Sequence, residues 1–543
     1  MKKAFKKAVS LVLALALMIS VSAVCFAAHE TEKTPVILIP GFGQSQTLVY
    51  DDNGEFLGDI STFELAGLET KTLVMNVIKE LLLPLGVSAI TRNDVALSKA
   101  VKGFMEELFK PFALNDNGSA VYNKKVRSFN KPYSELSKEE QSLIYSNVSL
   151  DKLGEYDSVR YYYTYDSFGS VKAAAEGLHD YLHNVVLAQT GAKKVNFVPI
   201  SQGGAVFIQY IAMFPEDAKY IKKLVCMIPA FDGSQIVGDI LLDNVRVYDI
   251  ERLHREILPA LLEGDGGYQA SVALRLALSS KTLEKVLRTA VAEARDMLAL
   301  KSSMMWALCP SGSYEEARNL LLSDEKYAAV RAETESFNAA RKAFPQTLKA
   351  LKENGTYVHI IASYNMGYFL APLFNCHLDD ADNLLAPYSA ALGATAAEFG
   401  KAFAEDYASP KTYCNNPAHN HISPDRKIDA STGFLPENTW FFKSVSHMGM
   451  NGREDVKGFA AELVMDDDIR DIYSCPGYGQ FTDPAEKVSS RVLSQTGKSY
   501  LCYDKDGNYL YAERIPTDSG KTFSFWKLLY TAFNGLFSVF SGR

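Results

Sequence analysis

The sequence has no long run of basic residues, and its 543 residues carry a formal net charge of −8. Because phosphates repel a mildly acidic chain, we expect no nucleic-acid partner. Internal repeats and low-complexity segments are also absent, which excludes a repeat protein. Two fragments resemble parts of calcium loops, DDNGE at 51–55 and DKDGN at 504–508, but neither has a full ligand set. We therefore expect hairpin turns at these positions.

The N-terminus has the pattern of a secretory signal peptide at residues 1–28. Four lysines (Lys2, Lys3, Lys6 and Lys7) precede an apolar run at 8–26, and two alanines end it. Polar residues follow from His29 onward, as at the start of a mature chain. We expect a protein that is secreted or associated with the cell surface; an uncleaved membrane anchor is the alternative.

Cysteine is scarce, and six cysteines remain once the signal peptide is removed. Because export permits disulfides, we expect Cys376–Cys414 and Cys475–Cys502 as the first pairings to test. Cys226 lies in the apolar run LVCMIPAF and is predicted to be a buried free thiol.

A metal site is the alternative use of some of these cysteines. The residues that could assemble it are Cys376, His377, Asp379, Cys414, His419 and His421. A disulfide with exposed loop histidines is the simpler interpretation, so we predict no metal. His377, His419 and His421 remain weak candidates for metal ligands.

Short apolar runs alternate with helical patterns along much of the chain. The expected strands are 35–39, 158–164, 195–200, 223–230, 356–363 and 439–446, and the expected helices include 171–190 and 201–214. Continuous apolar strands joined by helices indicate an α/β fold, with a mostly parallel central sheet and helices on both faces.

The helical and irregular stretches predict the domain organisation. We expect a first part of the core at 29–234 with an insertion at about 60–155, then a helical cap at 235–350. The second part of the core follows at 351–455. A C-terminal extension at 456–543 contains a hairpin pattern at 500–513 and an aromatic tail, FWKLLYTAFNGLFSVF, at 525–540. We expect the tail to dock on the core as a helix; an interfacial lipid anchor is the alternative.

The segment VNFVPISQGGAV at 195–206 carries the main chemical signal. A nucleophile elbow needs a strand, a sharp turn that presents the nucleophile, and a helix, and small residues must flank the turn. Here Ser201 is the nucleophile candidate, and Gly203 and Gly204 allow the close approach. Pro199 stands where the usual pattern has its first glycine, so this elbow is a variant.

Upstream, PVILIPGFGQS at 35–45 fits a loop that supplies a backbone N–H to a developing oxyanion. Gly41 and Gly43 permit a tight turn that presents the Phe42 amide. The second donor should be the amide of Gln202, which follows the nucleophile at a helix N-terminus.

A serine nucleophile also needs a base and an acid that orients the base. In α/β-hydrolases the base follows the acid, which follows the nucleophile. His447 fits because it comes after the strand-like TWFFKSV, whereas His419 and His421 lie in a turn-rich loop. Asp382 is our choice of acid in HLDDADNLLAPYSA, with Asp380 as the alternative.

Taken in order, these motifs resemble the lecithin:cholesterol acyltransferase-type branch of the α/β-hydrolase lipases. The matching stretches between about 35 and 450 are PVILIPGFGQS, VRYYYTYDSF, VPISQGG, KKLVCMIPAFDGS, SSMMWALCP, DNLLAP and TWFFKSVSHMG. The sequence departs from the branch at Ser167-Phe168, where a Trp-Arg pair is common, and at Ile200, where a histidine is usual. The resemblance implies ester chemistry on acyl lipids or smaller esters, and the departures bear on the substrate and the acyl acceptor.

The sequence therefore predicts a secreted serine hydrolase that cleaves carboxylic esters through an acyl-enzyme on Ser201. We expect no cofactor, a small ester or lipid substrate, and contact with a lipid surface through the cap or the tail. Acyl transfer by the same triad and a serine peptidase or amidase are alternatives within this fold. A non-enzymatic binding protein is the alternative from another class.

Overall fold

The computed structural model describes residues 33–60, 95–144, 151–257, 275, 278–368, 371–447, 453–475 and 477–483, and the backbone of two strands near the C-terminus. Its centre is a seven-stranded sheet in the order β14-β13-β8-β7-β6-β1-β5. Every neighbouring pair in it is parallel. The strands are β1 (Val36–Ile39), β5 (Arg160–Tyr162), β6 (Val195–Pro199), β7 (Ile221–Met227), β8 (Tyr357–Tyr364), β13 (Thr439–Lys443) and β14 (Phe481–Thr482). The predicted α/β class with a mostly parallel sheet is confirmed.

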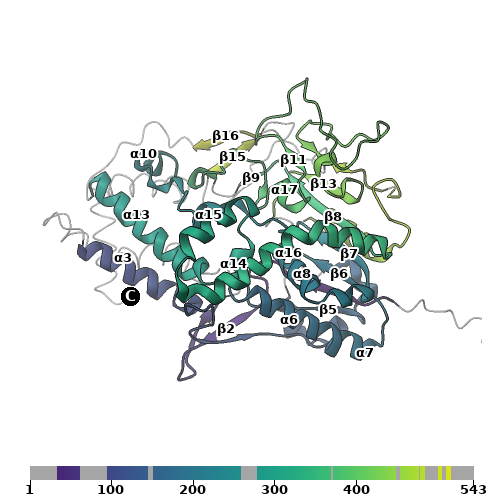
Figure 1. Cartoon of the computed structure of the whole chain (residues 1–543), viewed down its shortest axis with the longest axis horizontal. Coiled ribbons are helices and arrows are strands. Elements are labelled where there is room, and N and C mark those ends of the chain that lie inside the picture. The colour runs from purple at the N-terminus through teal and green to yellow at the C-terminus, as the bar shows by residue number, and fades with distance from the viewer. Residues whose placement is uncertain are drawn as a thin grey trace, which may run out of the picture.

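Both faces of this sheet are buried, as its apolar strands require. Alternate residues of β1 face opposite cores: Ile37 packs in one hydrophobic cluster and Leu38 in another. The first cluster is covered by α6 (Val171–Tyr181), α8 (Gly203–Met213) and α16 (Ala328–Glu353). The second is covered by α18 (Glu454–Met465) and a turn of helix at 151–156. Figure 1 shows α6, α8 and α16 lying together over the strands.

The helix that begins with α6 runs to Thr190 through a π-helical turn at 182–187 and α7 (Ala188–Thr190). It ends at Gly191, whose φ of 64° is the left-handed conformation that suits glycine at a helix end. Strand β6 follows directly and leads toward the nucleophile candidate.

The range predicted for the cap is mainly helical where the structure describes it. It contains α9 (Gln235–Leu241), α10 (Ile250–Arg252), α13 (Ser280–Arg295), α14 (Ser303–Ala307), α15 (Ser311–Leu321) and most of α16. Phe337, Phe344 and Leu348 of α16 lie in the same cluster as α8, so this helix belongs to the layer on the sheet. Helix α13 packs instead on α3 (Val95–Leu108) of the first insertion, and the two lie side by side at the left of Figure 1.

Small sheets stand beside the main one. Strands β2 (Thr47–Tyr50), β3 (Phe56–Asp59) and β4 (Asn123–Val126) form an antiparallel sheet, and α4 (Lys138–Ser142) follows. Two short pairs follow β8, namely β9 (Gly367–Tyr368) with β10 (Asp382–Asn383) and β11 (Thr395–Ala396) with β12 (Ile428–Asp429), with α17 (Pro387–Ala390) between them. Strands β15 (Ser499–Tyr503) and β16 (Tyr509–Arg514) pair as an antiparallel hairpin.

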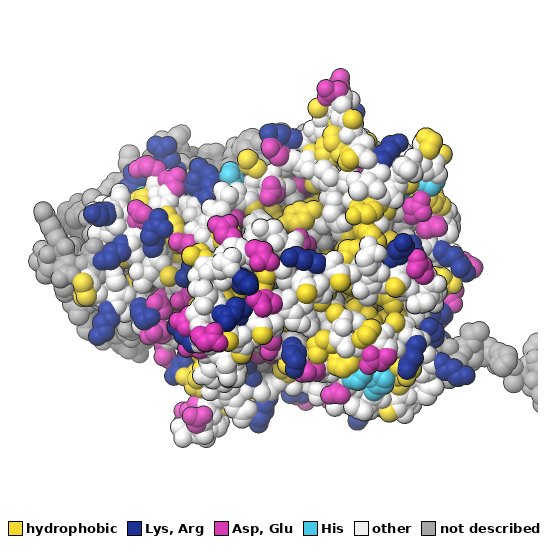
Figure 2. All heavy atoms as spheres, viewed as in Figure 1, with side chains coloured by type: hydrophobic (Ala, Val, Ile, Leu, Met, Phe, Trp, Pro, Cys, Tyr) yellow, Lys and Arg dark blue, Asp and Glu magenta, His cyan; other side chains and the backbone are white. Residues whose placement is uncertain are grey.

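The Asp51 carboxylate accepts hydrogen bonds from the Asn53 and Glu55 amides, so DDNGE forms a turn between β2 and β3. The predicted signal peptide at 1–28, the turn at 504–508 and the aromatic tail at 525–540 lie outside the described residues. No helix within the described ranges is long and apolar enough to cross a membrane. Acidic and basic side chains are interspersed over the face shown in Figure 2.

The predicted disulfide Cys376–Cys414 is wrong, because both of its cysteines are free. Cys226, Cys309, Cys376, Cys414 and Cys475 are all free thiols. Cys376 is buried in a small apolar cluster, where its amide donates to Asp239, whereas Cys414 lies in a separate loop beside His419. The Cys376–Cys414 pair is therefore not formed. The side chain of Cys502, the predicted partner of Cys475, lies outside the described residues. The prediction that Cys226 is a buried free thiol is confirmed.

Candidate active site

Ser201 stands on the sharp turn between β6 and α8. Its φ of 53° is a left-handed conformation, which is uncommon for a residue with a side chain and is strained. Backbone bonds hold it there: the Ser201 amide donates to the Met227 carbonyl at 3.0 Å, and the Ser201 carbonyl accepts from Gly204 and Ala230. The sequence predicts this strained geometry at the end of a buried strand.

The two glycines after the turn are sterically required. A Cβ on Gly203 would lie 2.4 Å from the Ile39 carbonyl oxygen, and one on Gly204 would lie 2.9 Å from Cβ of Pro229. Any larger residue would push α8 away from β1 and from the loop after β7. The glycine pair therefore fixes how closely the nucleophile turn packs against the sheet.

His447 lies in the loop after β13, with its side chain 7% exposed. The loop begins at Ser444, whose φ is 56° and whose amide donates to the Tyr364 carbonyl at 2.8 Å. This turn brings the imidazole back across the sheet, and Nε2 lies 2.8 Å from the Ser201 Oγ. The two residues are 246 positions apart in the sequence.

Asp382 is fully buried in β10, and its Oδ2 lies 2.8 Å from Nδ1 of His447. Its other oxygen, Oδ1, accepts from the amides of Leu384 at 3.0 Å and Leu385 at 2.8 Å. The His447 amide also donates to the Asp382 carbonyl. The carboxylate is thus held from both sides, and it can orient the imidazole with Nδ1 protonated and Nε2 facing the serine.

The alternative acid, Asp380, points elsewhere. Both of its oxygens accept from the Asn365 amide, at 2.9 and 3.0 Å, and Oδ1 also accepts from the Ala381 amide. Burial raises the pKa of Asp380 to about 7, although these amides and the Lys427 ammonium oppose the shift. Asp380 therefore serves as a buried acceptor within the loop, while Asp382 contacts the imidazole.

The loop predicted to hold an oxyanion lies against the nucleophile. A Cβ on Gly41 would come within 3.0 Å of Cβ of Ser201, so the loop backbone passes beside the serine. Gly43 has a φ of 71°, which completes the tight turn around Phe42. Gln202 is the N-cap of α8, and none of the hydrogen bonds between described residues uses its backbone N–H as a donor. The structure thus gathers the five predicted site residues Ser201, Asp382, His447, Phe42 and Gln202 in one region.

Ser167 is a residue of this site that sequence reasoning missed. Its hydroxyl accepts from the Gly43 amide at 3.0 Å, and its carbonyl accepts from the side-chain amide of Gln202 at 3.2 Å. The Tyr165 hydroxyl donates to the Pro40 carbonyl at 2.7 Å. These contacts tie both ends of the loop 40–43 to the segment after β5. The only signal in the sequence was the position of Ser167 directly after Tyr165-Asp166 in the matching stretch VRYYYTYDSF.

Two of the three weak metal candidates lie together. His419 and His421 share a cluster with Cys414 and with Glu437, which the sequence did not suggest. His377 lies elsewhere, with its Nδ1 2.9 Å from the Asn375 carbonyl. The cluster lies near the start of β13, whereas His447 follows the end of that strand.

Comparison with known proteins adds no identification. No family model matches the chain, and no curated protein matches it. The geometry of the site and the motifs in the sequence are therefore the basis for assigning a function.

Proposed function

We propose that this chain is a serine hydrolase of the α/β-hydrolase fold that cleaves carboxylic esters through an acyl-enzyme. One observation carries the proposal: the Ser201 hydroxyl, the His447 imidazole and the Asp382 carboxylate form a continuous relay, with 2.8 Å at each contact. A relay of this kind at the carboxyl ends of parallel strands supports nucleophilic catalysis. A buried aspartate and histidine can also occur in a structural network, but a strained serine at the end of the relay favours catalysis.

The proposed mechanism has two halves. In the first, His447 takes the Ser201 proton as Oγ attacks the ester carbonyl, and the amides of Phe42 and Gln202 stabilise the oxyanion. Collapse of the tetrahedral intermediate breaks the bond to the alcohol, which leaves with the proton from His447. In the second half, His447 activates water, which releases the acid and restores the serine. Asp382 keeps Nδ1 protonated throughout and stabilises the imidazolium.

The triad does not select between esters and amides, so the bond type comes from the resemblance to lecithin:cholesterol acyltransferase-type lipases. The order of the matching motifs supports that branch. The signal-peptide pattern supports an enzyme that works outside the cytoplasm, where acyl lipids and small esters are the substrates to test. Transfer of the acyl group to an alcohol uses the same first half-reaction, so it is a second outcome of the same assay.

A fluorophosphonate probe tests the proposal directly because it labels serines that are activated by a base. We expect labelling at Ser201 in the wild-type chain and its loss in Ser201→Ala and His447→Ala. His377→Ala is the matched control, since this histidine lies outside the site, and it should label at the wild-type rate. Full labelling of a folded Ser201→Ala protein would refute the assignment.

The same preparations define the reaction class. Nitrophenyl esters of increasing acyl length should be hydrolysed by the wild-type chain and not by Ser201→Ala, while peptide nitroanilides should be poor substrates. Faster turnover of the peptide substrates would contradict the ester proposal and leave the nucleophile intact. Product analysis in the presence of an added alcohol separates hydrolysis from acyl transfer.

A further inference from the structure

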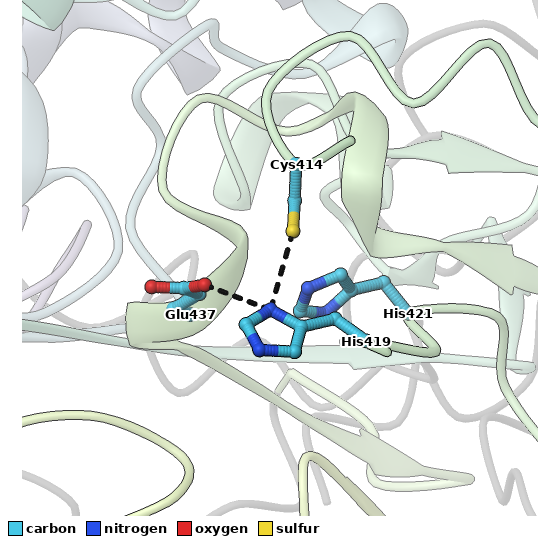
Figure 3. Close-up of side chains that lie close together, drawn as sticks. All are labelled: Cys414, His419, His421 and Glu437. Carbon is cyan, nitrogen blue, oxygen red and sulfur yellow. Dashed lines mark hydrogen bonds and ion pairs between the residues drawn. The ribbon is translucent and has the colours of Figure 1, made fainter. Parts of the chain in front are cut away.

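Four side chains of types that can bind a metal lie close together near the start of β13. They are Cys414, His419, His421 and Glu437, and one ligand atom from each lies within 4.8 Å of all the others (Figure 3). Three come from the long connection between β11 and β12, and Glu437 comes from a turn of helix at 436–438. We propose that these four side chains bind a zinc ion that fastens this connection to the sheet.

The measured contacts fit the edges of a tetrahedral site. The Sγ of Cys414 lies 3.4 Å from Nδ1 of His419, and the same nitrogen lies 3.1 Å from Oε1 of Glu437. Zinc bonds of about 2.3 Å to sulfur and about 2.0–2.1 Å to nitrogen or oxygen separate neighbouring ligands by about 3.6 Å and about 3.3 Å, respectively. These pairs are therefore already close to the required spacing, and the other ligand pairs, which lie within 4.8 Å, must close further to complete the site.

The hydrogen bonds around His421 support the metal site independently, because they leave one of its ring nitrogens available to bind a metal. It is 3% exposed, and its Nδ1 lies 2.8 Å from the side-chain oxygen of Gln480. The Gln480 side-chain nitrogen donates to the carbonyls of Pro436 and Thr439, which fixes the amide orientation. Nδ1 of His421 must then carry the proton, and Nε2 is left with a lone pair.

That lone pair is buried, and none of the described residues gives His421 Nε2 a hydrogen-bond partner. An unsatisfied buried acceptor is costly, so it needs a ligand or an ordered water. A second-shell oxygen that fixes the opposite ring nitrogen is the usual support for a zinc-bound histidine. Gln480 supplies this oxygen from the residue that precedes β14.

The donor set selects the class of metal. A thiolate and two imidazoles favour zinc over magnesium or calcium, which prefer oxygen. The negative charges of the Cys414 thiolate and the Glu437 carboxylate balance a divalent ion, and binding displaces the thiol proton. With four protein ligands the site is closed, which is the pattern of a structural rather than a catalytic zinc. Binding at Nδ1 of His419 moves its ring proton to Nε2, which lies 3.0 Å from the side-chain nitrogen of Asn416. Two donors cannot face each other, so zinc binding requires the Asn416 side chain to turn and give up the bond that its oxygen accepts from the Ala418 amide.

The test measures zinc content in the full-length protein after chelation, reloading and dialysis. We expect one zinc ion per chain in the wild type, and loss of at least about nine-tenths of it in Cys414→Ser and His419→Ala. Two histidine variants serve as controls and should keep the metal: His377→Ala, and His183→Ala from a second cluster with His179 and Asp217. The melting temperature of the wild type and the controls should rise by a few degrees on reloading, and that of Cys414→Ser should not.

A measurement on the wild-type protein alone removes any dependence on variants that fail to fold. Bound zinc should protect Cys414 from alkylation by iodoacetamide, as mapped by mass spectrometry, and chelation should restore the reaction. The proposal is overturned if the reloaded wild type holds no stoichiometric zinc, if Cys414→Ser keeps it, or if His183→Ala loses it. Equal alkylation with and without zinc, or a disulfide at Cys414, would also overturn it. These readouts do not involve ester hydrolysis, so they are independent of the proposed enzymatic activity.

Discussion

Replacing Asp382 with asparagine is the sharpest test of the relay, because the surroundings dictate how the new amide must sit. Two backbone N–H groups, from Leu384 and Leu385, point at Oδ1 of Asp382. The asparagine must therefore place its oxygen there and its NH₂ group where Oδ2 now meets Nδ1 of His447. Two donors cannot face each other, so the imidazole moves its proton to Nε2.

In this tautomer the His447 imidazole can no longer act as the general base. With a proton on Nε2, His447 donates toward Ser201 and cannot accept the hydroxyl proton. Loss of the correct tautomer costs about 10⁴-fold in kcat, or about 5 kcal/mol of transition-state stabilisation. We expect KM to change by less than about threefold, because Asp382 is fully buried and lies behind His447.

The assay is steady-state hydrolysis of a nitrophenyl ester at neutral pH, with thermal unfolding to confirm that each variant is folded. Asp380→Asn is the matched control, since it makes the same change two residues away in a carboxylate that contacts amides rather than His447. It should keep kcat within about threefold of the wild type. A loss of less than about tenfold in Asp382→Asn, or equal losses in the two variants, would refute the assignment of the acid.

Two further predictions concern the residues around the triad. Ser167→Ala leaves the buried Gly43 amide without its acceptor, so the loop that presents the Phe42 amide should be less well positioned. We expect kcat to fall by about tenfold with little change in KM, and an unchanged kcat would show that Ser167 does not position the loop. Because burial raises the pKa of Asp380 to about 7 from 3.8, the folded state binds its proton more tightly, and the free energy of unfolding should fall as pH rises from about 4 to about 7. Denaturant titrations at pH 5 and pH 8 should show a loss of about 2–3 kcal/mol in the wild type relative to Asp380→Asn, and a pH-independent difference between the two would contradict this account.

The core of the sheet is predictable from sequence because burial on both faces leaves continuous apolar runs. The run at 195–200 corresponds to β6, and the run at 356–363 to β8, within one residue at each end. The helix expected at 171–190 also has these bounds. The nucleophile elbow is equally local, because the strand, the strained serine and the two glycines are neighbours in sequence. One short motif is therefore enough to predict the turn and its steric requirements.

Contacts between segments that are far apart in the chain leave weaker signals in the sequence. The prediction of a Cys376–Cys414 disulfide failed because cysteine spacing does not reveal that Cys376 is buried beside Asp239, apart from the loop of Cys414. Glu437 and Gln480 were missed because a single glutamate before a strand and a single glutamine have no motif. Most of helix α16 falls in the range predicted for the cap. Amphipathic periodicity predicts that a helix has an apolar face and how long that face is, but it does not predict which element the face packs against.

The proposed zinc site and the proposed triad lie at opposite ends of strand β13. Glu437 and the zinc ligands lie before its first residue, while the loop that carries His447 begins after its last. A metal at the first end can fix the strand against β14 and the connection between β11 and β12, but it contacts no group of the relay. Loss of zinc should therefore lower the fraction of folded enzyme rather than the kcat of each folded molecule. A metal-free protein that stays fully folded but loses kcat would show instead that the two ends of β13 are coupled.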